Sequence, residues 1–200
     1  MKKGAVKAQQ VRSQLQQYTI GIAGLGGLGS NVAVSLVRAG IGGLVLVDFD
    51  RVDESNLNRQ HYFLSHLGQK KTEALTSILQ SINPHCTITT NDTKLTPGAM
   101  DLPFKSADVI IEALDDAAMK TAFIEEIQQK LPHTPLVSAS GVSGYGHIDR
   151  IQIKKMGTLT IVYDQDAKDV EDDILVAPRV NLIAQWQANI AIEVLLGEHQ

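Results

Sequence analysis

Residues Ile20 to Gly29 read IGIAGLGGLG, a short apolar run that leads directly into the spacing Gly24-x-Gly26-x-x-Gly29. Glycines at this spacing let the backbone approach a phosphate group and let the following helix pack closely on the strand. The N-terminus of that helix offers free N–H groups and the positive end of the helix dipole. This stretch therefore predicts a strand, a phosphate-binding turn and a helix, in that order.

A second strand is predicted at Leu44 to Val47, directly before Asp48. An acidic residue about 20 positions after the glycine motif is suited to bind a ribose hydroxyl, and Asp48 occupies that position. The pattern fits a dinucleotide as well as it fits ATP. The residues that follow Asp48 indicate which of these two ligands the site binds.

Two cations, Arg59 and Lys71, follow in the next segment. A hydride-transferring enzyme has little use for them beside its cofactor, because the glycine loop already serves the pyrophosphate. A triphosphate carries more negative charge than the pyrophosphate of a dinucleotide. Arginine makes forked contacts to phosphate and lysine supplies a compact point charge, so this pair favours ATP. The alternative is that both are ordinary surface charges, as most such residues are.

The apolar run Val109 to Ile111 predicts another strand, which is followed closely by Asp115. Ligands of an open parallel sheet bind outside the carboxyl ends of its strands, so Asp115 is expected at the same cleft. Its carboxylate is a suitable oxygen ligand for Mg²⁺. The alternative is that Asp115 caps the helix beginning near Ala117, because aspartate is a preferred N-cap residue. The combined pattern predicts ATP-dependent adenylation.

The chain resembles the adenylating enzymes of the ThiF/MoeB/HesA family, relatives of the ubiquitin-activating enzymes, over nearly its whole length. The block VDFDRVDESNLNRQ at residues 47–60 is more specific than the glycine motif. The other matching stretches are GLGGLGS (24–30), GQKK to INP (68–84), ALDDAAMK (113–120), PLVSASGVSGYG (135–146) and APRVNLIAQWQANIAIEVLLG (177–197). The closest likeness is to compact ThiF-type adenylyltransferases that act on ThiS, a ubiquitin-like sulfur carrier of thiamine biosynthesis.

The resemblance implies a role for each matching position. Phosphates lie over Gly26 and Gly27, Asp48 binds the ribose, Arg59 and Lys71 bind the triphosphate, and Asp115 binds Mg²⁺. Arg59, Lys71 and Asp115 are the residues expected to promote catalysis. The full set of predicted nucleotide-binding residues is Gly24, Gly26, Gly27, Gly29, Asp48, Asp50, Asn56, Arg59, Gln60, Lys71 and Asp116.

The reaction implied by the resemblance joins the C-terminal glycine carboxylate of a ubiquitin-like sulfur carrier protein ending in Gly-Gly to AMP, with release of pyrophosphate. The carboxylate is itself the nucleophile, so catalysis needs positioning and charge stabilisation rather than a nucleophilic side chain. The resemblance also implies a homodimer, in which an arginine near the N-terminus reaches the ATP of the other subunit. Arg12 is the candidate for that arginine.

The chain departs from larger family members in its cysteines. Many of those carry two C-x-x-C pairs that hold a structural zinc ion, whereas Cys86 is the single cysteine here, so no structural zinc is expected. Cys86 is better explained as a small buried apolar residue near the predicted strand at Thr87 to Thr90 than as a nucleophile.

Composition agrees with a compact cytoplasmic enzyme. The 200 residues, 44% of them hydrophobic, suffice for one domain, predicted to span residues 1–200. A formal charge of -4 gives no reason to expect a nucleic-acid partner. No run approaches the roughly 20 apolar residues of a membrane span, and Met1 to Gln17 lacks the apolar core of a signal peptide. One cysteine fits a reducing compartment.

Strand and helix patterns alternate, which predicts an α/β fold: a Rossmann-like, doubly wound, mainly parallel sheet. Residues from Ile148 onward predict a β-hairpin extension around Met156-Gly157, with strands at 148–153 and 158–163, before a final helix at Arg179 to Leu196. The acidic stretch Asp164 to Asp173 predicts a solvated loop, which is suited to cover the tail of a carrier.

Other function classes stay open at this point. An NAD-dependent oxidoreductase is the main alternative, although the sequence offers no separate substrate domain and no evident acid/base pair. A nucleotide-binding regulatory module is the next, although binding alone does not require Arg59, Lys71 and Asp115 together. Adenylation of a different carrier, such as the molybdopterin one, is equally compatible with the site residues.

Overall fold

The computed structural model describes residues 3–164 and 174–197. These residues form one seven-stranded sheet with strand order β3-β2-β1-β4-β5-β7-β6, and every neighbouring pair is parallel except β6 and β7. This arrangement confirms the predicted Rossmann-like α/β fold. The strands are β1 (Thr19–Ala23), β2 (Gly43–Val47), β3 (Thr87–Asn91), β4 (Val109–Glu112), β5 (Leu136–Ser140), β6 (Ile151–Met156) and β7 (Leu159–Asp164).

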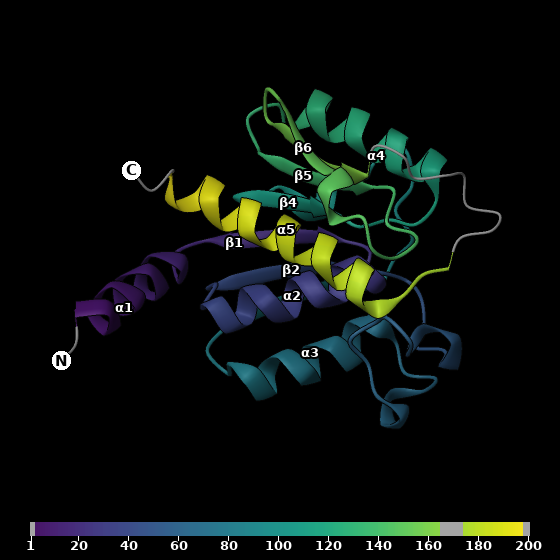
Figure 1. The fold of residues 1–200 in the computed structure, drawn as a ribbon, viewed down its shortest axis with the longest axis horizontal. Helices are drawn as coiled ribbons and strands as arrows, with labels where there is room; N and C mark the ends of the chain where they lie inside the picture. Colours follow the sequence, from purple (N-terminus) through teal and green to yellow (C-terminus); the bar gives the residue numbers. More distant parts are fainter. Residues whose placement is uncertain (1–2, 165–173, 198–200) are drawn as a thin grey trace.

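Helices cover both faces of the sheet (Figure 1). One apolar core lies between the sheet and α2 (Gly27–Ala39), α3 (Lys71–Ile82) and α5 (Ala177–Leu196). A second core on the other face contains Phe123 and Ile127 of α4 (Ala117–Lys130) together with Phe104. The remaining helix, α1 (Lys3–Leu15), precedes β1 and packs against α5. The central strands β1, β2 and β4 are apolar except at Thr19 and Glu112, because both of their faces are buried.

The predicted hairpin is confirmed, with a shift in its first strand. His147 has a left-handed backbone (φ 44°) and Ile148–Arg150 form a 3-10 turn, so β6 begins at Ile151 rather than at Ile148. The hairpin is also part of the main sheet, because β7 lies parallel to β5. The predicted acidic loop, Asp164 to Asp173, lies outside the described residues from position 165 onward.

The fold brings the carboxyl ends of β1, β2 and β4 to the same edge of the sheet. The N-termini of α2 and α5 also meet at this edge, where a Cβ on Gly27 would lie 3.0 Å from Cγ1 of Val180. No helix in the described part of the chain is long and apolar enough to cross a membrane. The carboxyl edge of the sheet is therefore where the predicted site residues are expected to meet.

Candidate nucleotide-binding site

The glycine loop joins β1 to α2, and two of its glycines are required by the fold itself. Gly24 has a φ of 89° and lies so close to the β4 turn that a Cβ would be 2.6 Å from the carbonyl oxygen of Ala113. A Cβ on Gly29 would be only 1.9 Å from the carbonyl oxygen of Gly24. Gly26 differs, because the nearest atom to its Cβ position is Nε2 of Gln60, at 3.7 Å. The fold therefore leaves space at Gly26.

Asp48 lies directly after β2 and is 9% exposed. Its Oδ2 accepts a hydrogen bond from the N–H of Leu25 at 2.6 Å, and its Oδ1 accepts one from the N–H of Asp50 at 2.7 Å. Burial raises the pKa of the Asp48 carboxyl, although Lys71 and the two backbone donors oppose that shift. Asp48 thus ties the glycine loop to the end of β2.

Lys71, the first residue of α3, forms an ion pair with Asp50 at 2.8 Å between Nζ and Oδ2. The lysine is 5% exposed, whereas 45% of the Asp50 side chain is exposed. The backbone N–H of Lys71 also donates to the carbonyl oxygen of Asp50, at 2.9 Å. An ammonium group has three donors, so Lys71 retains donor capacity beyond its bond to Asp50.

Arg59 lies over the start of α2, since its Cγ is 3.6 Å from the Cβ position of Gly27. Its guanidinium NH1 donates to the carbonyl oxygen of Ser55 at 3.1 Å and to Oδ1 of Asn58 at 2.8 Å. Asn56 is half-buried, and its Nδ2 lies 3.3 Å from Oγ of Ser55. Arg59 is therefore positioned beside the glycine loop but is already bonded within its own segment.

Gln60 is 9% exposed and lies beside Gly26. Its Oε1 is buried and has no hydrogen-bond partner among the residues described. Buried polar atoms are almost always hydrogen-bonded, so this unpaired oxygen indicates a place for a donor group or an ordered water at Gln60, whereas Nε2 is the Gln60 atom nearest to Gly26.

The structure adds three residues that the sequence did not single out. Oγ of Ser30 donates to the carbonyl oxygen of Gly26 at 2.6 Å, and Nδ2 of Asn31 donates to that of Gly27 at 2.7 Å and of Arg59 at 3.0 Å. The hydroxyl of Tyr62 donates to the carbonyl oxygen of Leu25 at 2.9 Å. These side chains fasten the segment after β2 onto the glycine loop. The sequence signal that could have indicated Ser30 and Asn31 is the presence of polar residues in an otherwise apolar helix.

The turn after β4 carries Asp115 and Asp116. Asp116 is the N-cap of α4, and its Oδ1 accepts a hydrogen bond from the N–H of Met119 at 2.7 Å. The alternative that Asp115 caps this helix is therefore wrong by one residue. Asp115 is exposed and makes no hydrogen bond or ion pair with any residue that the structure describes.

Arg12 and Cys86 lie away from this edge. The Arg12 side chain packs over Gly40, the C-cap of α2, at the end of that helix opposite the glycine loop. A helix of 13 residues is about 20 Å long, so Arg12 does not reach the loop of its own subunit. Cys86 is 5% exposed, as expected for a small buried residue, and burial raises the pKa of its thiol to about 11.

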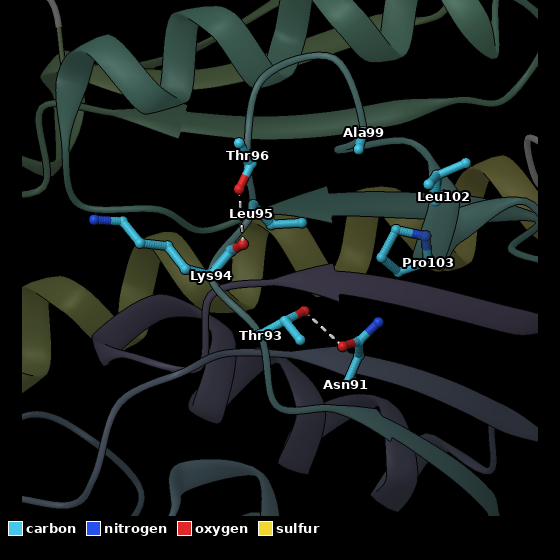
Figure 2. Close-up of a pocket in the computed structure, with 8 residues that line it drawn as sticks. All are labelled: Asn91, Thr93, Lys94, Leu95, Thr96, Ala99, Leu102 and Pro103. Carbon is cyan, nitrogen blue, oxygen red and sulfur yellow. Dashed lines mark hydrogen bonds between the residues drawn. The ribbon is translucent and has the colours of Figure 1, made fainter.

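A cavity of about 330 Å³ adjoins the site (Figure 2). It borders the end of β2, because the N–H of Asp48 donates to the carbonyl oxygen of Asn91 at 3.3 Å and Nζ of Lys94 lies 5.4 Å from the ring centroid of Phe49. The cavity is lined by Asn91, Thr93, Lys94, Leu95, Thr96, Ala99, Leu102 and Pro103. One residue of the cavity lining, Asn91, is thus directly bonded to Asp48.

The sequence model described as the ThiF family matches residues 4–200. The chain belongs to the ThiF family. Its relatives include a tRNA threonylcarbamoyladenosine dehydratase of Bacillus subtilis, 33% identical over 70% of this chain and 55% of the relative. Another relative is the molybdopterin-synthase adenylyltransferase of Escherichia coli, 29% identical over 92% of this chain and 75% of the relative.

The chain spans about half the length of the first of these relatives. Among solved structures, the E. coli tRNA N6-threonylcarbamoyladenosine dehydratase in complex with AMP superposes with a TM-score of 0.86 at 22% identity, covering 96% of this chain and 92% of that one. The same protein in complex with ATP gives a TM-score of 0.86 at 21% identity, over 96% of this chain and 91% of that one. This ThiF-family chain thus has the fold of a protein solved with adenine nucleotides.

Proposed function

We propose that this ThiF-family protein binds ATP with Mg²⁺ at the carboxyl edge of its sheet and transfers AMP to a carboxylate. The observation that carries the proposal is the pairing of a glycine loop and Asp48 with two cations, Arg59 and Lys71, on one side and an exposed carboxylate, Asp115, on the other. A dinucleotide-dependent oxidoreductase has no need for this charge arrangement.

Each part of ATP has a suitable place. The phosphates lie over Gly26 and Gly27, where the N-terminus of α2 favours negative charge, and Nε2 of Gln60, 3.7 Å from the Cβ position of Gly26, is a donor suited to a phosphate oxygen. Asp48 accepts hydrogen bonds from the ribose hydroxyls through lone pairs that Leu25 and Asp50 leave unused. The adenine ring occupies the cavity next to Phe49 and Lys94.

Asp115 fits a magnesium ligand. It is an exposed carboxylate on the same edge as the glycine loop and has no partner in the described part of the chain. Mg²⁺ is commonly held by one or two carboxylates together with substrate phosphates and water. When bound, the ion neutralises charge on the phosphate oxygens of ATP.

The chemical step forms a bond between an oxygen of the acceptor carboxylate and the α-phosphorus and breaks the bond from that phosphorus to the bridging oxygen of the β-phosphate. Pyrophosphate leaves with the electron pair of the broken bond. Arg59 and Lys71 stabilise the negative charge that develops on it, while the glycine loop holds the α-phosphate in line with the attacking oxygen. No side chain forms a covalent intermediate.

We propose that the acceptor is the C-terminal glycine of a ThiS-like sulfur carrier in thiamine biosynthesis, with a molybdopterin-type carrier as the alternative. The resemblance to compact ThiF-type enzymes supports the first acceptor, and the relative named molybdopterin-synthase adenylyltransferase supports the second. The relatives named tRNA threonylcarbamoyladenosine dehydratase add tRNA as a third acceptor to test. A cytoplasmic location stays a prediction.

The test is ATP–pyrophosphate exchange with radiolabelled pyrophosphate, measured with a ThiS-type carrier, a molybdopterin-type carrier, tRNA or no acceptor. We expect exchange that depends on the ThiS-type carrier and is lost when its terminal glycine is removed. Exchange with a different acceptor would correct the substrate and keep the chemistry. No exchange with any acceptor, together with tight NAD binding, would overturn the proposal.

We also propose a homodimer in which Arg12 acts on the other subunit. Because Arg12 lies at the far end of α2 in its own subunit, any catalytic role must be in trans. Mixing an Arg12→Ala protein with an Arg59→Ala protein should then restore part of the exchange activity through hybrid dimers. A monomer in sedimentation with full activity would contradict this arrangement.

A further inference from the structure

An ion pair between a fully buried carboxylate and a half-buried ammonium group lies beside the turn that carries Asp115. Glu112, the last residue of β4, is 0% exposed, and its Oε1 and Oε2 lie 2.8 Å and 2.6 Å from Nζ of Lys120 in α4. Oε1 also accepts the N–H of Leu114 at 2.7 Å, and Oε2 accepts the hydroxyl of Ser138 at 2.6 Å. Both carboxylate oxygens are therefore fully engaged.

This ion pair is a costly way to stabilise a fold. Removing the Glu112 carboxylate from water is expensive, and well-packed apolar residues often stabilise a protein as much as such an ion pair or more. Lys120 also lies near the N-terminus of α4, where the helix dipole disfavours a cation. The position of the pair, rather than its contribution to stability, calls for an explanation.

The pair links the two elements on either side of Asp115, because Glu112 ends β4 and Lys120 lies in the first turns of α4. On one side, Glu112 holds the N–H of Leu114, while Ala113 is held by β1 through a 2.9 Å bond to the carbonyl oxygen of Ala23. On the other side, Lys120 follows Asp116 by one helical turn and donates its own N–H to the carbonyl oxygen of Asp116 at 2.9 Å. Leu114 packs against the core and Asp116 caps α4, whereas Asp115 makes no hydrogen bond or ion pair with the described residues.

We propose that the Glu112–Lys120 ion pair is a positioning device that orients the Asp115 carboxylate toward the metal–triphosphate group. Glu112 and Lys120 do not touch the ligand. They hold the turn from Leu114 to Asp116 in one conformation, so that Asp115 loses little conformational freedom when Mg²⁺ binds. This inference rests on the proposed function, because it presumes that Asp115 is a magnesium ligand.

The chain offers a matched control at the other end of α4. Lys130, the last residue of the helix, forms ion pairs with Glu126 at 2.8 Å and with Asp101 at 2.9 Å. It resembles Lys120 in residue type, helix and partners. It differs in position, since α4 places it ten residues further along, away from the β4 turn.

The experiment measures the affinity of the protein for ATP by calorimetry over a series of Mg²⁺ concentrations, with Mn²⁺ as a second probe. In Lys120→Met, the half-saturating Mg²⁺ concentration should rise by about tenfold, the size of effect seen when residues that orient metal ligands are lost. Saturating Mg²⁺ should restore the affinity for ATP. Glu112→Gln removes the charge but keeps one acceptor oxygen for the N–H of Leu114, and its NH2 group can donate to the hydroxyl of Ser138. It should show the same shift, which covers the case that Lys120→Met does not fold.

Lys130→Met should lower the melting temperature and leave the Mg²⁺ dependence unchanged. The inference is wrong if folded Lys120→Met and Glu112→Gln retain the Mg²⁺ dependence of the wild type, or if Lys130→Met shifts it equally. A wild-type protein whose ATP affinity does not depend on Mg²⁺ would instead remove the metal role of Asp115 itself. Asp115→Asn provides the reference for a complete loss of the carboxylate.

Discussion

The two sides of the candidate site differ in whether their charged side chains already have hydrogen-bond or ion-pair partners. After β2, each charged side chain assigned to the nucleotide already has a partner: Asp48 binds backbone N–H groups, Lys71 binds Asp50, and Arg59 binds Ser55 and Asn58. After β4, Asp115 has no partner within the described residues. One side is held in place before the ligand arrives, and the other is left open.

The difference indicates what each side does when ATP binds. Arg59 has to exchange neutral partners for phosphate oxygens, a favourable exchange because hydrogen bonds between charged groups are stronger than those to neutral groups. Lys71 keeps its ion pair with Asp50 and donates its remaining N–H groups to phosphate oxygens. Asp115 breaks no bond when it takes up a metal ion, so its contribution to affinity depends on how well the turn beneath it is held.

The largest effect is expected from loss of the cations after β2. Lys71→Met and Arg59→Ala should each slow ATP–pyrophosphate exchange by about 10²- to 10³-fold, the usual result of removing one group that stabilises transition-state charge. Lys71 is buried and paired, so Lys71→Met should also lower the melting temperature. The hydrogen bonds of the Arg59 guanidinium go to neutral groups of its own segment, so the stability of Arg59→Ala should stay near that of the wild type.

Arg51→Ala is the control for these variants. Arg51 lies in the same segment, is exposed, and donates to the carbonyl oxygen of Gly68 at 2.7 Å. Its loss should leave exchange within about twofold of the wild type, because exposed charges away from a site rarely matter. Equal losses in Arg51→Ala and Arg59→Ala would mean that the segment acts through its fold rather than through Arg59.

An intermediate effect is expected on the β4 side, where adjacent aspartates have separate tasks. Asp115→Asn should slow exchange by about 100-fold, the equivalent of roughly 3 kcal/mol, without changing the free energy of unfolding. Asp116→Ala removes the N-cap and should lower that free energy by about 1 kcal/mol. Urea denaturation and exchange assays on both variants test this division. A destabilised Asp115→Asn would contradict it.

A smaller effect concerns stability and pH, away from both sides of the site. Burial raises the pKa of Glu126, but the bonds from Lys130 and from the N–H groups of Gly98 and Met100 outweigh it and lower that pKa to about 2 from its ordinary 4.5. A lowered carboxyl pKa stabilises the folded state above the unfolded pKa, and this contribution is lost as pH falls from about 4.5 toward 2.

Melting temperatures of the wild type and of Glu126→Gln should therefore converge as the pH is lowered through this range. The wild type should be the more stable protein near neutral pH. A constant difference in melting temperature between pH 6 and pH 2.5 would show that Glu126 does not titrate as the ion-pair network requires.

The smallest effect is expected for the single cysteine. Cys86→Ser should retain exchange activity, because the carrier carboxylate attacks phosphorus directly and the buried thiol stays protonated at neutral pH. A modest loss of stability is expected from placing a hydroxyl in an apolar environment. Loss of exchange in a folded Cys86→Ser protein would require a covalent step that the proposed chemistry lacks.

The local pattern of the sequence predicts the main features of the molecule and misses those that depend on distant contacts. The glycine loop, Asp48 and the alternating elements follow from spacing and hydrophobic periodicity. The hydrogen bonds from Asn31 to Arg59 and from Tyr62 to Leu25 span 28 and 37 residues, so no local sequence pattern predicts them. The pairing of β7 with β5 is missed for the same reason.

The error at Asp115 has a different origin. Asp115 and Asp116 have equal preferences for the N-cap, and the helix boundary decides between them. Sequence patterns locate a helix end to within a few residues, which is too coarse for adjacent aspartates. The structure shows that Asp116 is the cap and that Asp115 makes no hydrogen bond or ion pair with the residues it describes.

The most direct test of the account is a calorimetric titration of the wild-type protein with ATP in the presence of Mg²⁺ and, separately, with NAD. The charges on both sides of the site predict saturable binding of ATP that weakens when Mg²⁺ is removed, and no measurable binding of NAD. Tight binding of NAD with no binding of ATP would contradict the assignment of this edge of the sheet to a triphosphate.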